Sequence, residues 1–151
     1  DWKSIKKAMK YNERKPGRIR GASTISQQVA KNVFLWQGRS WIRKGLEVYF
    51  TFMIELIWGK KRILEMYLNV VEMGEGVFGI EMAAKKYFNK PAKNLTRLEA
   101  AMIAACLPNP KRYTVKPLSA YVSSRSQFVM RQMNNLQTDP DIQKLVGLSP
   151  P

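Results

Sequence analysis

Apolar residues recur at spacings of three and four along almost the whole chain, and glycines and prolines separate blocks of helical length. This pattern is typical of α-helices, and the sequence lacks the sustained alternation of a β-sheet. A capping box from Thr24 to Gln27 starts the first clear helix, whose apolar stripe runs to Trp36 before Gly38 breaks it. The pattern predicts an all-α chain that forms one compact lobe over residues 1–151.

The next block begins after Ser40, a residue type that caps helix N-termini, and stops at Gly59. Its apolar residues lie on more than one face, which predicts a central helix buried among the others. Further helices are predicted over 60–73, 80–88, 96–107, 118–136 and 139–147, with a glycine loop at 74–79.

Charge narrows the range of partners, because the chain has a formal net charge of +15 and residues 14–46 contain no acid. Such a surplus attracts a nucleic acid, an anionic membrane surface or a phosphorylated ligand. The sequence contains no histidine, which excludes His-dependent hydrolysis and His-ligated zinc. Cys106 lies in an apolar run and is predicted to be a buried structural thiol. No stretch reaches the roughly 20 apolar residues of a membrane-spanning helix.

Polar residues at the start of the first helix form one candidate site. Gln27 and Lys31 are four residues apart and share a helix face, with Gln28 beside them and Ser23 and Thr24 at the N-terminus. Amides suit sugar hydroxyls, while an ammonium group and free backbone N–H groups suit phosphate oxygens. The residues therefore fit a sugar-phosphate, although the same pattern also fits a capped, solvated surface helix.

A second candidate site surrounds Glu47, which ends the acid-free run. Arg39, Arg43 and Glu47 follow each other at spacings of four, and Lys44 precedes Glu47 by three, so all four can project to one side. Surface ion pairing would explain this arrangement. A single carboxylate does not neutralise three cations, however, so an anion from outside the chain is the other explanation.

Exposed hydrophobic residues are the remaining signal. Residues 33–36 are four consecutive apolar residues at the end of the first predicted helix, so they cover all of its faces there. Trp41 and Ile42 follow after the helix break at Gly38. With lysines and arginines nearby, they suit a membrane interface, although some of them would instead fill the core. Glu72 and Glu75 flank the glycine loop and could hold a cation weakly, but a solvated rim is the simpler interpretation.

Four segments of the chain resemble the signature segments of the peptidoglycan glycosyltransferases, glycosyltransferase family 51, and occur in the same order. They lie between Gly21 and Tyr113 and read GASTISQQVAKN, RKGLE, KKRILEMYLNVVEMGEGVFGIEMAAKKYF and RLEAAMIAACLPNPKRY. The resemblance implies a lysozyme-like, mostly helical fold with a small membrane-associated jaw. It also implies a monofunctional enzyme that polymerises lipid II on the outer, periplasmic face of the cytoplasmic membrane.

The resemblance gives roles to individual residues. Glu47 resembles the family's second essential glutamate, and Lys31 and Arg39 resemble the cations that hold the donor's pyrophosphate. Gln27 and Gln28 resemble the amides that line the sugar path. Arg43 and Lys44 match the paired basic positions of the RKxxE segment.

The implied chemistry is an inverting displacement, in which a sugar hydroxyl attacks the donor's anomeric carbon and a lipid pyrophosphate leaves. Glu47 could orient the cations, hold a divalent metal such as Mg²⁺ or Mn²⁺, or act as an acid; the sequence leaves these roles open. The implied partners are lipid II, the growing glycan strand, the membrane and moenomycin-type inhibitors, without nucleic acid. Two alternatives stay open: a basic helical nucleic-acid-binding module, and a catalytically silent membrane-bound relative.

One departure from the family pattern concerns its first glutamate, the presumed base, which lies in a segment expected before GASTISQQ. That segment is not in residues 1–151, so the glycosyltransferase domain is expected to be incomplete at its N-terminus. We expect a longer chain that includes the segment to polymerise lipid II, and residues 1–151 alone to fail. Normal turnover by residues 1–151 in a lipid II polymerisation assay would contradict this expectation.

Overall fold

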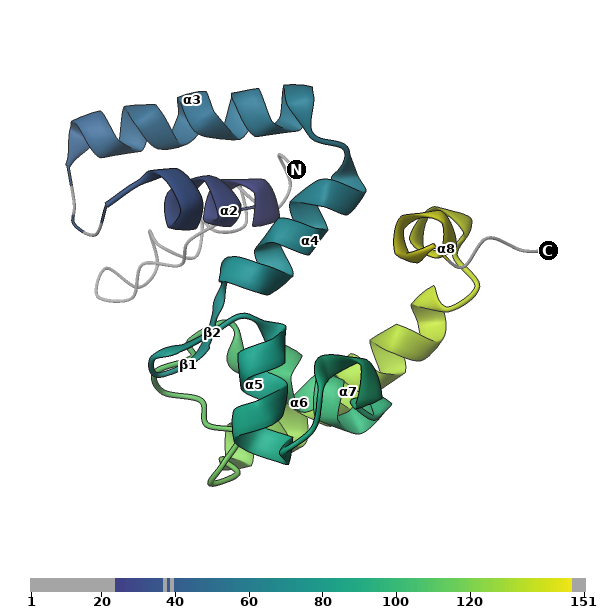
Figure 1. Ribbon diagram of the computed structural model, residues 1–151. Helices are drawn as coiled ribbons and strands as arrows, with labels where there is room; N and C mark the ends of the chain where they lie inside the picture. Colours follow the sequence, from purple (N-terminus) through teal and green to yellow (C-terminus); the bar gives the residue numbers. More distant parts are fainter. Residues whose placement is uncertain (1–23, 37, 39, 148–151) are drawn as a thin grey trace, which may run out of the picture.

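The computed structural model of the protein describes residues 24–36, 38 and 40–147, and these residues form a mainly helical fold (Figure 1). It contains one two-stranded antiparallel hairpin and a short 3-10 turn at Ala92–Asn94. The prediction of an all-α chain is confirmed, in agreement with the lysozyme-like fold that the resemblance implies. The helices are α2 (Ile25–Phe34), α3 (Trp41–Ile57), α4 (Lys60–Val70), α5 (Ile80–Phe88), α6 (Arg97–Cys106), α7 (Ala120–Leu136) and α8 (Pro140–Val146), and the hairpin strands are β1 (Glu72–Gly74) and β2 (Val77–Phe78).

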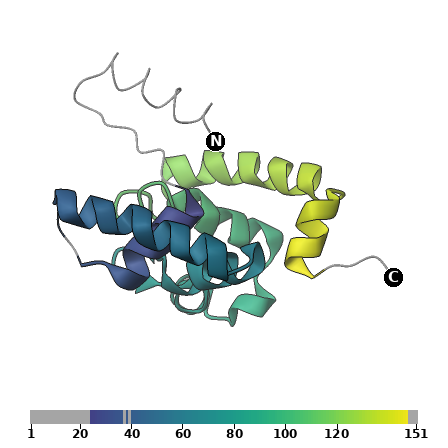
Figure 2. The same cartoon turned by 90° about the horizontal axis from the view of Figure 1, so that it is seen from above.

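The helices form an upper and a lower group that α4 connects. Helix α3 packs on α2 at the top, and α4 contacts both of them as it descends to the hairpin (Figure 1). Below, α5 lies beside the hairpin and α6 packs along α7, while α8 returns to α4. Seen from above, α7 lies to one side of α3 (Figure 2). The hairpin follows the end of α4 and stands directly below it (Figure 1).

Side-chain caps start the helices where the sequence predicted them. Thr24 and Thr96 each form a complete capping box, and the Ser40 hydroxyl accepts the Arg43 backbone N–H at 3.0 Å. Three predicted boundaries were wrong. Helix α7 begins at Ala120 rather than at residue 118, because Ser119 is its N-cap. Helix α2 ends at Phe34 rather than continuing to Trp36, because the backbone becomes extended at the next residue.

The wrong boundary at the end of α4 changes the site. Helix α4 ends at Val70 rather than at residue 73, and the predicted glycine loop is the β1–β2 hairpin. Val71 already has extended dihedral angles, and Gly76 makes the turn with a positive φ of 69°. The short alternation of buried and exposed residues here spans too few positions for a sequence pattern to reveal a strand.

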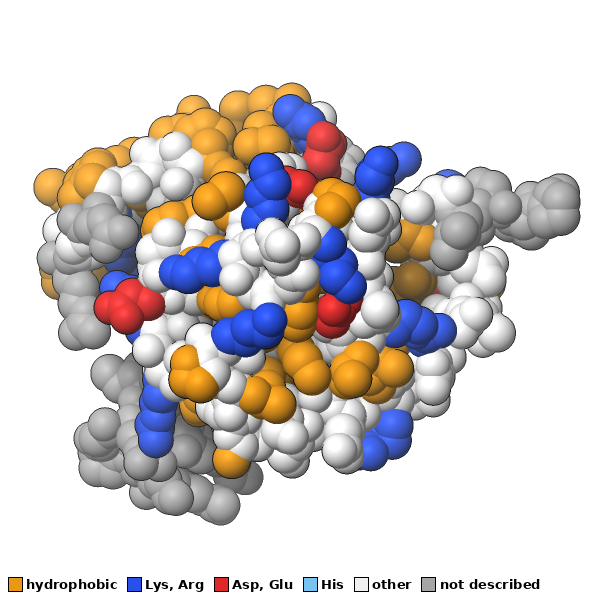
Figure 3. All heavy atoms as spheres, turned by 60° about the horizontal axis from the view of Figure 1, so that its bottom comes forward, with side chains coloured by type: hydrophobic (Ala, Val, Ile, Leu, Met, Phe, Trp, Pro, Cys, Tyr) orange, Lys and Arg blue, Asp and Glu red, His pale blue; other side chains and the backbone are white. Residues whose placement is uncertain are grey.

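Helix α3 is peripheral, so the prediction of a central helix was wrong. Only Glu47 and Ile54 are buried along its length. Trp41, Ile42 and Leu56 expose 93%, 74% and 70% of their surface. One face packs on α2, and the described residues leave the opposite apolar face uncovered; hydrophobic side chains gather along the upper edge of the space-filling view (Figure 3). No helix among the described residues is long and apolar enough to cross a membrane.

The lower core fixes the hairpin in place. The Tyr87 hydroxyl donates to the Met73 carbonyl at 3.1 Å, and the Cys106 thiol sulfur lies 3.1 Å from the same oxygen. Cys106 is fully buried, and this desolvation raises the pKa of its thiol to about 11, which confirms the predicted structural role. Since two buried side chains converge on one strand carbonyl, the hairpin position depends on core packing rather than on its two strands alone.

The hairpin conformation depends on a glycine at its end. Gly79 has φ 79° and ψ 155°, a region almost restricted to glycine, and a Cβ there would lie 2.6 Å from the Asn69 carbonyl oxygen. We expect Gly79→Ala to lower the free energy of unfolding by about 3 kcal/mol or more. Gly76→Ala is the matched control, because its φ is also positive but no atom lies within 4 Å; it should cost about 1 kcal/mol. Equal losses in urea denaturation would contradict this account of the hairpin.

Candidate functional site

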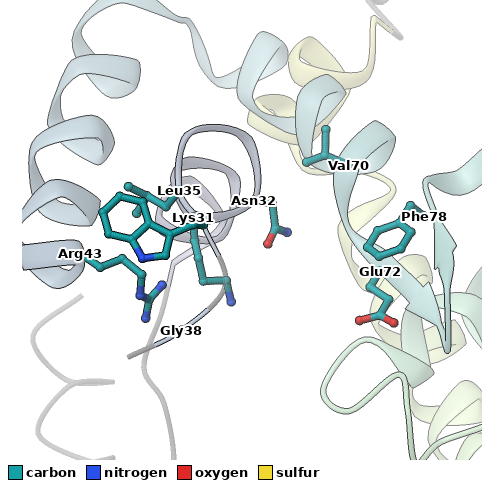
Figure 4. Close-up of a pocket in the computed structure, with 9 residues that line it drawn as sticks. Lys31, Asn32, Leu35, Gly38, Arg43, Val70, Glu72 and Phe78 are labelled. Atoms are coloured by element: carbon teal, nitrogen blue, oxygen red, sulfur yellow. The ribbon is translucent and has the colours of Figure 1, made fainter. Parts of the chain in front are cut away.

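The candidate site is a cavity of about 430 Å³ between α2 and the hairpin. This volume is typical of small-molecule sites. Lys31 and Asn32 on α2 and Arg43 on α3 form one side, and Glu72 and Phe78 on the hairpin form the other (Figure 4). The remaining lining residues are Leu35, Trp36, Gly38 and Val70. The α2–α3 connection and the hairpin thus provide opposite walls of one hollow.

A single buried carboxylate organises the basic wall. Glu47 is only 5% exposed, and its Oε1 accepts a hydrogen bond from Lys44 Nζ at 2.7 Å. Arg43 Nη1 lies 4.0 Å from the other carboxylate oxygen, so Glu47 attracts two cations at once. Helical spacing alone produces this arrangement, because residues three and four positions before Glu47 share its face. One negative charge between two positive charges leaves a local surplus of positive charge.

Arg43 has a buried side-chain nitrogen that lacks a hydrogen-bond partner. Its side chain is 16% exposed, and its Nε is buried without a hydrogen-bond partner among the described residues. A buried guanidinium N–H without an acceptor is costly, and such groups normally have a partner. Because Arg43 also lines the cavity, an anion bound there would supply the missing acceptor.

The other residues predicted for the first site lie on α2 or its cap. Lys31 is exposed and lines the cavity, so the structure brings it together with Arg43. Thr24 and Gln27 bond to each other in the capping box, where Gln27 Oε1 accepts the Thr24 N–H at 3.1 Å. Gln28 is half-buried and, like Gln27, does not line the cavity. The substrate roles of these amides stay predictions.

Two predicted site residues, Ser23 and Arg39, lie outside the described residues. Lys44 is 55% exposed and reaches Glu47 rather than the cavity, and with Ser40 and Trp41 it borders a neighbouring hollow of about 270 Å³. Sequence reasoning also missed some of the lining. Asn32 follows Lys31 directly and could have been included, whereas Glu72 was interpreted as a solvated rim and Phe78 was not considered. Only the hairpin brings those two residues to face α2.

The carboxylates do not form a metal site of their own. Within the described ranges, no three His, Cys, Asp or Glu side chains come close enough to hold a metal ion. Glu47 offers one carboxylate, and Lys44 and Arg43 already surround it. Mg²⁺ in proteins is usually bound by one or two carboxylates together with substrate phosphates. The predicted option of a divalent cation stays a prediction.

Comparisons with known proteins identify the family and similar proteins. The family model described as Transglycosylase matches residues 1–134. Two similar proteins, both named biosynthetic peptidoglycan transglycosylase, come from Escherichia coli strain K12/DH10B and Escherichia coli strain HS. Each is 59% identical over 144 residues, which are 95% of this chain and 60% of the relative. The chain therefore spans less than two thirds of the length of these relatives.

The basic wall depends on Glu47, which gives a stability prediction. Glu47→Gln leaves the partly buried Arg43 without a counter-charge, and we expect the free energy of unfolding to fall by about 2 kcal/mol, less than for a fully buried pair because both cations keep some exposure to water. Glu65→Gln is the control, since Glu65 pairs with Arg62 at 3.0 Å on the surface and should change stability by less than about 0.5 kcal/mol. Indistinguishable urea midpoints for the two variants would show that Glu47 does not organise this wall.

Proposed function

This chain belongs to the transglycosylase family, glycosyltransferase family 51, and from that premise we propose that its protein is a peptidoglycan glycosyltransferase. The proposed reaction joins lipid II units into β-1,4-linked glycan strands. The anomeric carbon is inverted and undecaprenyl pyrophosphate is released. The family match over residues 1–134 and the relatives' printed names support this activity.

The observation that carries the proposal is the buried, unsatisfied Nε of Arg43 at the edge of the cavity. A pyrophosphate has several acceptor oxygens and carries the negative charge that this basic wall lacks. Arginine binds phosphate oxygens through two parallel N–H groups, and Lys31 supplies a second positive charge on the same side of the cavity. A neutral ligand would satisfy the hydrogen bond but would leave the surplus charge.

The same wall would act on the chemical step. When the bond from the anomeric carbon to the phosphate oxygen breaks, negative charge grows on the departing pyrophosphate. Fixed cations stabilise this charge more in the transition state than in the ground state, and removing one such donor commonly costs about 10²–10³ in rate. Arg43 and Lys31 are the residues placed to do this in the described cavity.

Glu47 would act through its neighbours. Its carboxylate accepts from Lys44 and lies near Arg43, so it holds the Arg43 side chain, which lines the cavity, while Lys44 lies at the neighbouring hollow. A carboxylate paired in this way is a positioning group for the leaving-group cations. Of the three roles that the sequence left open, orientation of the cations agrees best with these contacts.

The exposed apolar face of α3 supports a position at a membrane surface. Tyr49, Phe52 and Leu56 expose 56%, 63% and 70% of their surface along this helix. Aromatic and aliphatic side chains presented by an amphipathic helix insert into the headgroup region, and the net charge of +15 adds attraction to anionic lipids. We infer that the protein acts at the outer, periplasmic face of the cytoplasmic membrane. There lipid II and the glycan strand would be its substrates, and moenomycin-type compounds its inhibitors.

The rival function, binding of a nucleic acid, explains the charge alone. A nucleic-acid surface would present lysines and arginines to solvent along a phosphate path. Here the key arginine is partly buried beside a carboxylate in a cavity of small-molecule size, and α3 presents an exposed apolar face. A catalytically silent relative would keep both features, so a rate measurement must separate it from the enzyme.

Polymerisation of lipid II by the intact protein tests the proposal. Arg43→Met keeps the approximate size of the side chain and removes its donors, and we expect kcat/KM to fall by about 10²–10³. Arg62→Met is the matched control, because Arg62 is an exposed arginine away from the cavity lining, and its kcat/KM should stay within about twofold.

The wild-type protein separates the alternatives. It should bind a donor-mimicking phosphoglycolipid in preference to duplex DNA across a salt series, because condensed counterions make DNA binding fall steeply with salt. Binding of the phosphoglycolipid without polymerisation would indicate the silent relative. Tight DNA binding that excludes the phosphoglycolipid would contradict the proposal.

A further inference from the structure

The hairpin side of the cavity has a different chemical character from the α2–α3 side. Lys31 and Arg43 bring positive charge to one wall, whereas Glu72 is the only acid among the described residues that line the cavity. In Figure 4 the Glu72 carboxylate and the Phe78 ring lie across the hollow from Lys31 and Arg43, with the Asn32 amide between them. The cavity is therefore electrically polarised from one end to the other.

Hairpin pairing places Glu72 and Phe78 together. The two residues are directly opposite each other in the β1–β2 register. Opposed residues of an antiparallel pair project to the same face, a few ångströms apart. The carboxylate and the aromatic ring thus form one unit that the strand geometry fixes, supported from behind by the Tyr87–Met73 hydrogen bond.

The Glu72 carboxylate keeps unused acceptor capacity. Its Oε1 accepts the Gly76 backbone N–H at 3.1 Å, which holds the side chain against the turn. Among the described residues it forms no ion pair, because each salt bridge there involves Glu47, Glu65 or Glu99. An ionised carboxylate has about four acceptor positions, so Oε2 is available to donors in the cavity.

Phe78 exposes 53% of its surface although it sits in a hairpin that packs on the core. A flat aromatic ring beside a carboxylate suits a pyranose, because the ring packs on the apolar C–H face of the sugar while the carboxylate accepts its hydroxyl or amide N–H groups. The same end disfavours a phosphate, since Glu72 would repel it. The opposite end attracts a phosphate through Lys31 and Arg43.

We propose that Glu72 and Phe78 form a sugar subsite that binds an N-acetylhexosamine attached to a diphosphate, while Lys31 and Arg43 bind the diphosphate itself. This assignment rests on the proposed function, and it adds the direction in which the substrate lies. The phosphates point toward α2 and α3, and the first sugar points toward the hairpin. Glu72 is then a residue that selects and orients the sugar rather than one that takes part in bond breaking.

Two soluble probes separate the sugar subsite from the diphosphate site: a short-chain prenyl diphosphate, and the same lipid diphosphate carrying an N-acetylhexosamine. Calorimetric titration of the wild-type protein should show tighter binding of the sugar-bearing probe. Glu72→Ala and Phe78→Ala should each weaken that probe by about tenfold, the size of one charge-assisted hydrogen bond or one stacked ring. Both variants should bind the sugar-free probe as wild type does.

Conservative variants separate the loss of a sugar contact from a general disruption of the hairpin. Glu72→Gln keeps the oxygen that accepts the Gly76 N–H, so the hairpin contact is retained, but an amide NH2 replaces Oε2; its affinity for the sugar-bearing probe should therefore fall about as far as that of Glu72→Ala. Phe78→Tyr keeps the ring and should bind as wild type does. Lys31→Ala should weaken both probes together, because it removes charge from the diphosphate end.

The outcomes distinguish the two proposals. If wild-type protein binds neither probe, the proposed diphosphate site fails. If it binds both probes with equal affinity, the diphosphate site stands and the sugar subsite is wrong. If Glu72→Ala changes both affinities by the same factor, Glu72 acts only through its charge on the phosphates, and the sugar assignment is again wrong.

Discussion

The ion cluster of Glu47, Lys44 and Arg43 is the interaction on which the site depends. Burying a carboxylate is costly unless it is paired, and helix geometry brings Glu47, which is 5% exposed, two cations from the preceding turn. The pairing holds Arg43 in a partly buried position with one N–H lacking an acceptor. The cluster therefore supplies both the surplus positive charge and the N–H without an acceptor on which the proposed anion site rests.

The fold supplies the second wall by joining two groups of helices through α4. Helix α4 contacts α2, α3 and α5, so the hairpin at its end is set at a fixed place relative to the basic wall. Core contacts to the Met73 carbonyl from Tyr87 and Cys106 keep the hairpin there. Because the anion site and the hairpin belong to different groups of helices, the cavity exists only when both are folded and packed on α4.

Sequence reasoning predicted the parts of this structure that depend on local chemistry. Capping boxes and glycines located most helix ends, and the lone acid after the basic run identified the Glu47 cluster. Reasoning failed where a distant partner decides the outcome. Helix α3 has apolar residues on several faces, which usually indicates burial, yet its outer face stays exposed, as a membrane-facing helix would require. Glu72 and Phe78 sit in strands too short to leave a periodic pattern, and their role depends on α2, which lies across the cavity.

The most direct test of the anion site observes the Arg43 Nε–H itself by side-chain NMR, with its signal assigned from its loss in Arg43→Lys. On addition of inorganic pyrophosphate, the account predicts that this signal shifts and that its hydrogen exchanges with water more slowly, because a phosphate oxygen becomes its acceptor. The Arg62 Nε–H, on the exposed surface of α4, should not respond. An Arg43 signal that stays unchanged at saturating pyrophosphate, while other arginine signals move, would contradict the account.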